Sequence, residues 1–262
     1  PSGSGVTQLT DLPDDESNPS WSADGQQITF TVLLLRGGGA WIYTMEADGS
    51  VQRPLVHVGI DDIGDAQAIS PTFTPSGKRI VYSTRAAIRS IGVDGADPET
   101  IFRVPKTSFG RCCVNYPTVS SDGKRIAFAR AAPRLRDSGL WAMNRNGEDL
   151  RHLSSPPARD REIRNPDFSP DGKRIYFESG ERFLFMRRDA SRPKKIPGLS
   201  SAPQASISPS GDQVVKQAGI FSSDGLQSCG YLVTQPLGPG EAFRLTQNCE
   251  TSSEVSAAWP SW

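Results

Sequence analysis

The sequence predicts an all-β protein, a six-bladed β-propeller built from four-stranded antiparallel blades. Two observations lead to this prediction: a turn motif that recurs five times, and a β-branched or aromatic run that follows each copy. The turn glycines are Gly25, Gly77, Gly123, Gly172 and Gly211, and successive copies lie 52, 46, 49 and 39 residues apart. Periods of this size indicate stacked supersecondary units, and four short strands per unit are typical of propellers.

The first two strands of each repeat flank the recurring turn. The first strand is expected to end at an apolar residue that is buried between neighbouring blades. This residue is Trp21, Phe73, Val119, Phe168 and Ile207 in successive copies. An Asp-Gly or Ser-Gly pair then makes a tight turn, because glycine adopts positive φ without steric cost. The second strand follows as a β-branched and aromatic run, for example residues 28–30 and 175–177.

The third and fourth strands flank a second turn. A third apolar run, such as residues 41–43 or 140–143, leads to a polar turn, which is Asp48-Gly49 in the first repeat and Asn146-Gly147 in the third. The fourth run is polar or carries proline, as in residues 53–56, which suits an outer edge strand that must not pair with other chains. No window has apolar residues at helical spacing over three turns, so no helix is expected.

The two ends of the chain are expected to share a closing blade. Residues 2–10 align with residues 146–154, the last turn and outer strand of the third repeat, and residues 255–262 read as a first strand. We therefore expect a single domain, 1–262, with blades at approximately 18–58, 70–105, 116–155, 165–198 and 203–247 and a closing blade from 255–262 plus 1–10. The middle strands of that blade are missing, and we expect about 30 further residues upstream. A five-bladed ring with loose ends is the alternative.

The repeat resembles the TolB-like propeller family, the WD40-like Pro-Asp repeat of bacterial envelope and secreted proteins. The resemblance covers the whole chain and is carried by Asn-Pro-Asp-Phe-Ser-Pro-Asp-Gly-Lys-Arg-Ile at 165–175 and by Trp-Ile-Tyr-Thr-Met-Glu-Ala-Asp-Gly-Ser at 41–50. The chain has no Trp-Asp dipeptide, so eukaryotic WD40 repeats are a poorer match. The resemblance implies a propeller that docks peptides or protein partners, although fold alone does not give function.

Composition narrows the class of partner. Lys plus Arg and Asp plus Glu both number 29, whereas a nucleic-acid-binding protein normally shows a basic excess. No run of 18 apolar residues is present, so no membrane insertion is expected. We expect a monomer with no cofactor.

The four cysteines favour an extracytoplasmic location, periplasmic or extracellular. Cys229 is expected just before the third strand of the fifth repeat and Cys249 just after its fourth, which would bring them within disulfide reach; two free thiols are the alternative. Cys112 and Cys113 are adjacent, and their Cα separation of about 3.8 Å falls below the usual disulfide range. Either a strained vicinal disulfide or two thiols would fit. Their spacings match no zinc site.

Functional residues are expected on one face. The connections between second and third strands, and between blades, vary widely and emerge on the same side, where binding residues concentrate. The candidate partner-binding residues on these loops are acidic in the early blades and basic later, namely Asp61, Asp62, Asp65, Arg111, Arg134, Arg136, Arg159 and Arg161. Ordinary solvated loop charges are the alternative interpretation. A cation at Asp61, Asp62 and Asp65 would lack the usual calcium-loop order.

Catalytic signatures are scarce. His57 and His152 both lie on expected outer strands, and no nucleophile elbow or phosphate-binding Gly-rich loop is present. We therefore expect a non-catalytic secreted or periplasmic binding scaffold that recognises a protein or peptide on the variable loops. The alternatives are a polysaccharide lyase or hydrolase with its site at the central channel, and a propeller module of a larger protein.

Overall fold

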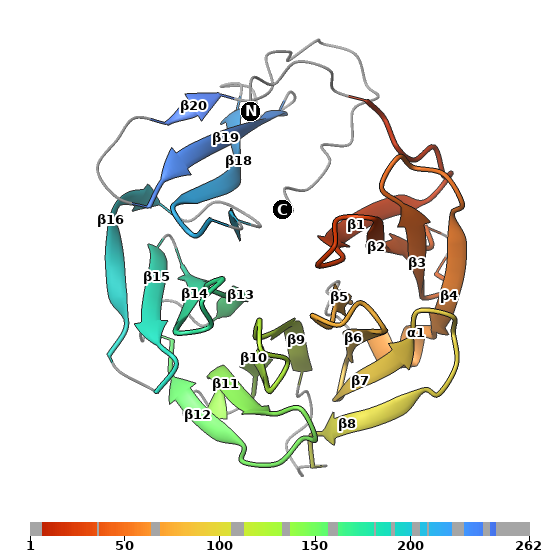
Figure 1. Cartoon of the computed structure of the whole chain (residues 1–262), viewed down its shortest axis with the longest axis horizontal. Helices are drawn as coiled ribbons and strands as arrows, with labels where there is room; N and C mark the ends of the chain where they lie inside the picture. The colour runs from red at the N-terminus through yellow and green to blue at the C-terminus, as the bar shows by residue number, and fades with distance from the viewer. Residues whose placement is uncertain are drawn as a thin grey trace.

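The computed structural model describes residues 7–35, 37–63, 69–105, 113–132, 137–156, 162–180, 182–189, 192–200, 205–208, 210–221, 228–237 and 242–244. These residues form five four-stranded antiparallel sheets arranged as the blades of a propeller (Figure 1). Strand order in every sheet follows chain order, with the first strand toward the centre and the fourth at the rim.

The strands and the one short helix have the following bounds. Blade 1 consists of β1 (Asp15–Trp21), β2 (Gln27–Leu33), β3 (Ala40–Glu46) and β4 (Arg53–Val58). Helix α1 (Ile60–Ile63) follows, and blade 2 consists of β5 (Thr72–Phe73), β6 (Arg79–Thr84), β7 (Ala87–Gly92) and β8 (Glu99–Arg103). Blade 3 consists of β9 (Cys113–Val119), β10 (Arg125–Ala131), β11 (Gly139–Asn144) and β12 (Arg151–Ser154).

The remaining two blades complete the described arc. Blade 4 consists of β13 (Ile163–Phe168), β14 (Arg174–Ser179), β15 (Arg182–Arg187) and β16 (Lys194–Ser200). Blade 5 consists of β17 (Ser206–Ile207), β18 (Gln213–Phe221), β19 (Ser228–Pro236) and β20 (Phe243–Arg244). In Figure 1, no described strand lies between blade 5 and blade 1.

The expected phase of the repeat is confirmed, because the first strands end at the five apolar residues that the sequence singles out. The expectation of no helix is wrong at one place, since α1 forms a single turn between blades 1 and 2. Four residues carry no periodic apolar pattern, so periodicity could not reveal this turn. No helix among the described residues is long and apolar enough to span a membrane.

A hydrogen-bonded box explains why the turn between first and second strands recurs. In blade 4 the Ser169 hydroxyl donates to Asp171 Oδ1 at 2.5 Å and accepts from the backbone N–H of Arg174 at 2.9 Å. Blades 1 and 3 make the same two contacts. In blade 2 the Thr74 hydroxyl contacts the Ser76 hydroxyl, and in blade 5 the Ser208 hydroxyl donates to Asp212; both hydroxyls again accept from a backbone N–H of the second strand. The Ser169 hydroxyl and a backbone N–H stabilise the carboxylate, so the pKa of Asp171 lies below its usual value.

The same turns make contacts between blades. The backbone of Gly211 has a φ of +73°, and a Cβ added there would lie 3.3 Å from Cδ of Pro170 in the turn of blade 4. A Cβ at Gly123 would likewise lie 3.8 Å from Cδ of Pro75 in the turn of blade 2. Glycine therefore allows both the left-handed backbone conformation and the close approach of the neighbouring proline.

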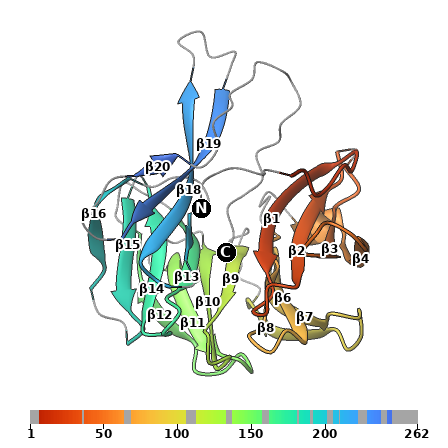
Figure 2. The ribbon, with the colours of Figure 1, turned by 45° about the horizontal axis from the view of Figure 1, so that its top comes forward.

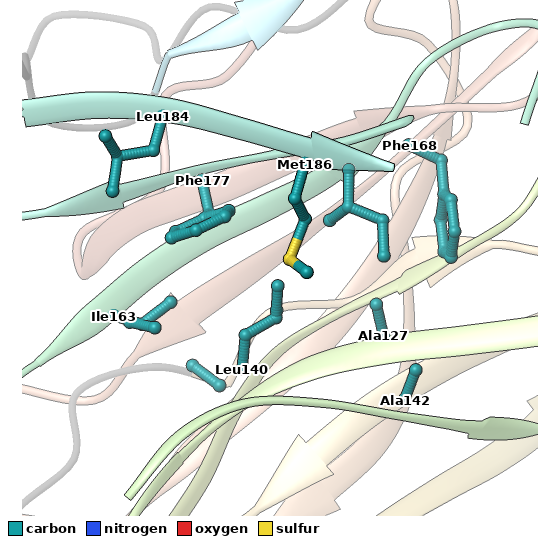
Figure 3. Close-up of a cluster of buried hydrophobic side chains, with 10 residues drawn as sticks. Ala127, Leu140, Ala142, Ile163, Phe168, Phe177, Leu184 and Met186 are labelled. Atoms are coloured by element: carbon teal, nitrogen blue, oxygen red, sulfur yellow. The ribbon is translucent and has the colours of Figure 1, made fainter. Parts of the chain in front are cut away.

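The core lies between blades, where apolar faces of adjacent sheets meet. Figure 3 shows the cluster between blades 3 and 4. Its buried members are Ala127, Ala129, Leu140, Ala142, Ile163, Phe168, Ile175, Phe177, Leu184 and Met186. Similar clusters join blade 1 to blade 2, blade 2 to blade 3, and blade 4 to blade 5.

Burial of the residues that end the first strands follows from these contacts. Phe73, Phe168 and Ile207 are each 6% exposed and lie in the clusters between blades. Trp21 and Val119 are only half-buried, contrary to the expectation that all five are buried. Trp21 lies on the face of blade 1 away from blade 2, beside residues 9 and 12, while Val119 borders the cluster between blades 2 and 3.

The N-terminal segment covers that face of blade 1. The Leu9 carbonyl accepts a hydrogen bond from Gln52 Nε2 at 3.0 Å, and a Cβ at Gly49 in the β3–β4 turn would lie 2.8 Å from the same oxygen. In blade 3, Gly147 makes the equivalent close approach to the carbonyl of Ile101, which lies in β8 of the preceding blade. Leu9 thus occupies the place that an outer strand of a preceding blade occupies elsewhere.

Replacing Phe168 should destabilise the fold through the cluster of Figure 3. Because Phe168 is buried between blades 3 and 4, Phe168→Ala should lower the free energy of unfolding by about 3–5 kcal/mol in chemical denaturation. Leu35→Ala is the control, since Leu35 is 61% exposed and its loss should be small. A loss below about 1 kcal/mol for Phe168→Ala would contradict the packing.

Candidate functional site

Antiparallel blades place their connections on two distinct faces. The turns between strands one and two and between strands three and four lie on one face, here called the turn face. The connections between strands two and three, and those between blades, lie on the opposite, variable-loop face. Figure 2 shows β18 and β19 extending beyond the other blades on the variable-loop side. Their pairing is continuous from Gln213↔Pro236 to Phe221↔Ser228.

Two of the predicted acidic residues lie on the variable-loop face. Asp61 and Asp62 are exposed on α1, and the Asp62 carbonyl accepts a hydrogen bond from the backbone N–H of Arg85 at 2.5 Å. The Arg85 carbonyl in turn accepts from Val114 N–H of blade 3 at 3.3 Å. The helix is therefore held against the β6–β7 turn. Asp65 lies outside the described residues, and no group of three metal-ligating side chains occurs within them.

The predicted basic residues cannot be placed on this face. Arg111, Arg134, Arg136, Arg159 and Arg161 all lie outside the described residues. Their described neighbour Arg164 donates to Glu162 Oε2 at 2.7 Å, which supports the view that part of this charge is paired locally.

A described basic pocket lies between blades 3 and 4. This pocket, of about 390 Å³, is lined by Ser154, Ser155, Phe177, Ser179, Arg182, Leu184, Pro193 and Lys195. Arg182 and Lys195 are exposed above the buried side chains of Phe177 and Leu184, and the lining contains no carboxylate. Such a pocket suits a negatively charged group attached to an apolar stem.

The cysteine predictions remain untested, because each expected pair has one member outside the described residues. Cys113 begins β9 and is half-buried, whereas Cys112 is not described. Cys229 lies within β19 opposite Ile220, not before the strand as expected, and Cys249 is not described. No disulfide is seen among the residues that the structure describes.

The two histidines lie at the rim, as expected for outer strands. His57 in β4 is exposed, rests against the ring of Trp41 at a centroid distance of 5.0 Å, and bonds through Nε2 to the Gly38 carbonyl at 2.9 Å. His152 in β12 is also exposed and stacks on Trp141 at 4.8 Å. Both positions are structural contacts of the outer blade.

A polar channel lies at the centre of the propeller. It forms a cavity of about 370 Å³, and its lining comes from the first strand and adjoining residues of all five blades. In blades 1, 3 and 4 the residue before the lining proline has positive φ, with values of +52° at Asn18, +54° at Tyr116 and +45° at Asn165. The strand pairing is irregular at these positions, as expected for a β-bulge, which redirects the chain at the channel wall.

The two asparagines at these bulges tie their blades to the next connection. The amide of Asn18 donates to the Ile69 carbonyl at 3.2 Å, just before blade 2. The amide of Asn165 donates to Glu178 Oε1 at 3.1 Å, and the same oxygen accepts from Ala205 N–H at 3.3 Å, just before blade 5. Glu178 is 4% exposed, so this buried carboxylate is held by the connection between two blades.

One repeat position forms a ring around the channel. Strand pairing aligns the position two residues after the bulge, and the five blades place Ser20, Thr72, Thr118, Asp167 and Ser206 there. All five line the channel. This set is called the hydroxyl ring below, because four members carry a hydroxyl and Asp167 replaces the fifth.

Asp167 is the one charged side chain among the described residues that line the channel. Its Oδ1 accepts from the Thr118 hydroxyl at 3.4 Å and its Oδ2 from Ile207 N–H at 3.5 Å, both long for hydrogen bonds. Removal from water raises the pKa of Asp167 to about 6, against the opposing effect of these two donors and of the backbone N–H of Phe168. Asp167 is not among the site residues predicted from the sequence, although an alignment of the repeats shows an aspartate where the other copies have serine or threonine.

Comparisons with known proteins identify the fold. No family model matches the chain, and no curated protein matches its sequence. Among solved structures, one assigned as TolB from Agrobacterium tumefaciens superposes with a TM-score of 0.63 at 20% identity, covering 90% of this chain and 82% of that one. TolB from Acinetobacter baumannii gives a TM-score of 0.63 at 14% identity, and the match covers 87% of this chain but about half, 53%, of that protein.

Enzymes with the same architecture are also similar. An oligogalacturonate lyase from Vibrio parahaemolyticus gives a TM-score of 0.55 at 9% identity, with 95% of this chain and 83% of that chain covered. Identities this low show a shared propeller fold and leave function to be argued from the site.

The carboxylate of Asp167 should make stability depend on pH. Its ordinary pKa is 3.8 and its folded pKa is about 6, so between these values the folded state binds more protons and stability falls as pH rises. Asp167→Asn should therefore be more stable than wild type at pH 7, and this advantage should shrink toward pH 4 in urea unfolding at several pH values.

Asp171→Asn is the matched control with the opposite sign. The pKa of Asp171 is lowered by folding, so its carboxylate stabilises the fold above pH 3.8 and loses that effect as pH falls. Asp171→Asn should be less stable than wild type at pH 7. If the two variants respond to pH in the same direction, the environment assigned to Asp167 is wrong.

Proposed function

We propose that the protein is a non-catalytic binding scaffold that recognises a protein or peptide segment through its variable-loop face. The observation that carries this proposal is the difference between the two faces. The turn face repeats one hydrogen-bonded box in every blade, while the variable-loop face differs between blades and bears the projecting β18–β19 hairpin. Variable loops on a rigid scaffold are where recognition concentrates.

The charged residues on this face favour a partner that carries both positive and negative charges. Asp61 and Asp62 on α1 are exposed at the junction of blades 1 and 2 and would attract a basic segment. Arg182 and Lys195 border the pocket between blades 3 and 4 and would attract a carboxylate. The basic loop residues Arg111, Arg134, Arg136, Arg159 and Arg161 belong to the same part of the proposal. Asp65 would extend the acidic side.

A glycoside hydrolase with its site at the channel is less well supported. Glycoside cleavage by the usual mechanism needs two carboxyl groups that flank the scissile bond. Among the described residues that line the channel, Asp167 is the one carboxylate. For a lyase, the likeness to oligogalacturonate lyase extends to the fold alone.

The proposed setting is periplasmic or extracellular. It rests on the resemblance of the repeats to envelope and secreted propellers and on the expected Cys229–Cys249 pair, which would persist in an oxidising compartment. For Cys112 and Cys113, both a vicinal disulfide and two free thiols stay compatible with this setting.

We further propose that the ring has a sixth blade position that both ends of the chain close, with residues 7–10 in the place of its outer strand. Residues 1–6 and 255–262, which belong to the same prediction, lie outside the described residues. The contact between Leu9 and Gly49 supports this assignment, because Gly147 and Ile101 make the same contact between blades 2 and 3. The apolar face formed by Ile28, Phe30 and Val32 would then be covered by the sixth blade, as the equivalent faces are elsewhere.

The sixth position predicts that Leu9 behaves like the equivalent residue of blade 1. Leu9 and Leu55 are both half-buried, and each lies against the β3–β4 or β7–β8 turn of the blade that follows it. Leu9→Ala and Leu55→Ala should each reduce the free energy of unfolding by about 1 kcal/mol, roughly half the value for a fully buried leucine. A loss for Leu55→Ala with none for Leu9→Ala would exclude this role for residues 7–10.

Selection from a displayed random-peptide library would test the binding function. Peptides enriched on wild type should bind in calorimetry, and Arg134→Ala/Arg136→Ala/Arg159→Ala and Arg182→Ala/Lys195→Ala should each weaken acidic peptides about tenfold or more. Asp61→Ala/Asp62→Ala should weaken basic ones.

The turn face provides the matched control. Lys78, Lys124 and Lys173 occupy one repeat position after the turn glycine and are exposed. Lys78→Ala/Lys124→Ala/Lys173→Ala removes three positive charges from that face and should leave binding unchanged. Failure to enrich any peptide, or loss of binding in the turn-face variant alone, would contradict the proposal.

A further inference from the structure

We propose that the central channel is a binding site for an alkylammonium group, such as a lysine side chain of a partner segment, with Asp167 as the anionic acceptor. The inference deepens the proposed function, because it names the chemical group that the channel takes from the partner, and it rests on that proposal. It assigns a ligand class to residues that lie outside the predicted partner-binding set.

The starting observation is a buried carboxylate that has no cationic partner among the described residues of the channel lining. A carboxylate has about four lone-pair sites. Asp167 accepts long hydrogen bonds from the Thr118 hydroxyl at 3.4 Å and from Ile207 N–H at 3.5 Å, and a third from the backbone N–H of its neighbour Phe168. No lysine or arginine is among the described residues that line the channel. Asp167 is half-buried as a whole residue and lines the channel.

Repetition in the sequence shows that the fold does not require this charge. The four equivalent residues of the hydroxyl ring are serine or threonine, and their blades have the same strand pairing as blade 4 at this point. A charge that is partly removed from water without a partner costs stability. A costly group in a cavity, at a position where the fold accepts a neutral one, is expected at a functional site.

The rest of the ring suits an ammonium group. An ammonium carries three N–H donors and no acceptor, and the hydroxyls of Ser20, Thr72 and Ser206 offer acceptors beside the carboxylate of Asp167. Trp21 also lines the channel, and an aromatic ring can attract a cation. A bound ammonium would supply the missing charge and the missing donors together.

A metal ion is a weaker fit. Calcium takes six to eight oxygen ligands and is usually bound by several carboxylates. The described residues contain no group of three His, Cys, Asp or Glu side chains that could hold a metal. The channel itself contributes one carboxylate.

Small probes can test the site without a known partner. The probe is N-acetyl-lysine-N-methylamide, and its matched control is the norleucine analogue, which keeps the aliphatic chain and lacks the charge. Binding would be followed at pH 7 through the ¹³C shift of the Asp167 carboxyl group and by calorimetry. Wild type should bind the lysine probe, with a shift at Asp167, and bind the norleucine analogue about tenfold more weakly or less.

Two variants of Asp167 separate charge from structure. Asp167→Asn keeps the shape, and Asp167→Ser restores the residue type of the other blades; both should fold and lose binding of the lysine probe about tenfold or more. Asp171→Asn removes one negative charge from the turn of the same blade and should bind like wild type. Equal binding of both probes, undiminished binding by Asp167→Asn, or calcium in place of the lysine probe at Asp167 would overturn the inference.

The two proposals fail in different ways. If library-selected peptides bind the variable-loop face but the lysine probe does not shift Asp167, the channel assignment is wrong and the scaffold function stands. If the probe binds at Asp167 but no peptide depends on the variable-loop residues, the ammonium site stands and the scaffold proposal is lost.

Discussion

The structure depends on the packing of apolar faces between neighbouring blades. A four-stranded sheet with side chains on both faces cannot bury them alone, so each blade needs a neighbour on either side. Phe168 illustrates this, because it ends the first strand of blade 4 and packs against Ala127 and Ala142 of blade 3. Each blade must therefore place its apolar side chains opposite those of its neighbours.

The turns between first and second strands also contribute to the packing of neighbouring blades. The hydroxyl of Ser169 fixes the loop, and the proline and glycine of adjacent turns, such as Pro170 and Gly211, come into contact across the blade boundary. One short motif therefore both closes the hairpin of its own blade and contacts the neighbouring blade. This double use explains why the turn motif persists while the connections on the opposite face diverge.

Local features were predictable from the sequence and neighbour-dependent ones were not. The ends of the first strands depend on a turn motif and a two-residue alternation, both of which are local. The half-burial of Trp21 depends on which blade covers it, and helix α1 is too short to leave a periodic signal. Asp61 and Asp62 were placed on an exposed connection as expected, whereas the predicted basic residues lie outside the described chain. Asp167 was visible only by comparing the repeats position by position.

The repeats also allow each blade to be compared with the others, position by position. In a propeller, each blade shows what the fold needs at a given position, so a departure from the repeat requires its own explanation. Asp167 replaces a hydroxyl at a cost in desolvation, and it does so where five blades converge on one cavity. The pocket between blades 3 and 4 carries charge of the opposite sign, because Arg182 and Lys195 border it and its lining contains no carboxylate. The described lining of the channel thus holds a negative charge without a cation, and that of the pocket holds positive charges without a carboxylate. This arrangement supports the proposal that a partner with charges of both signs completes the pairing.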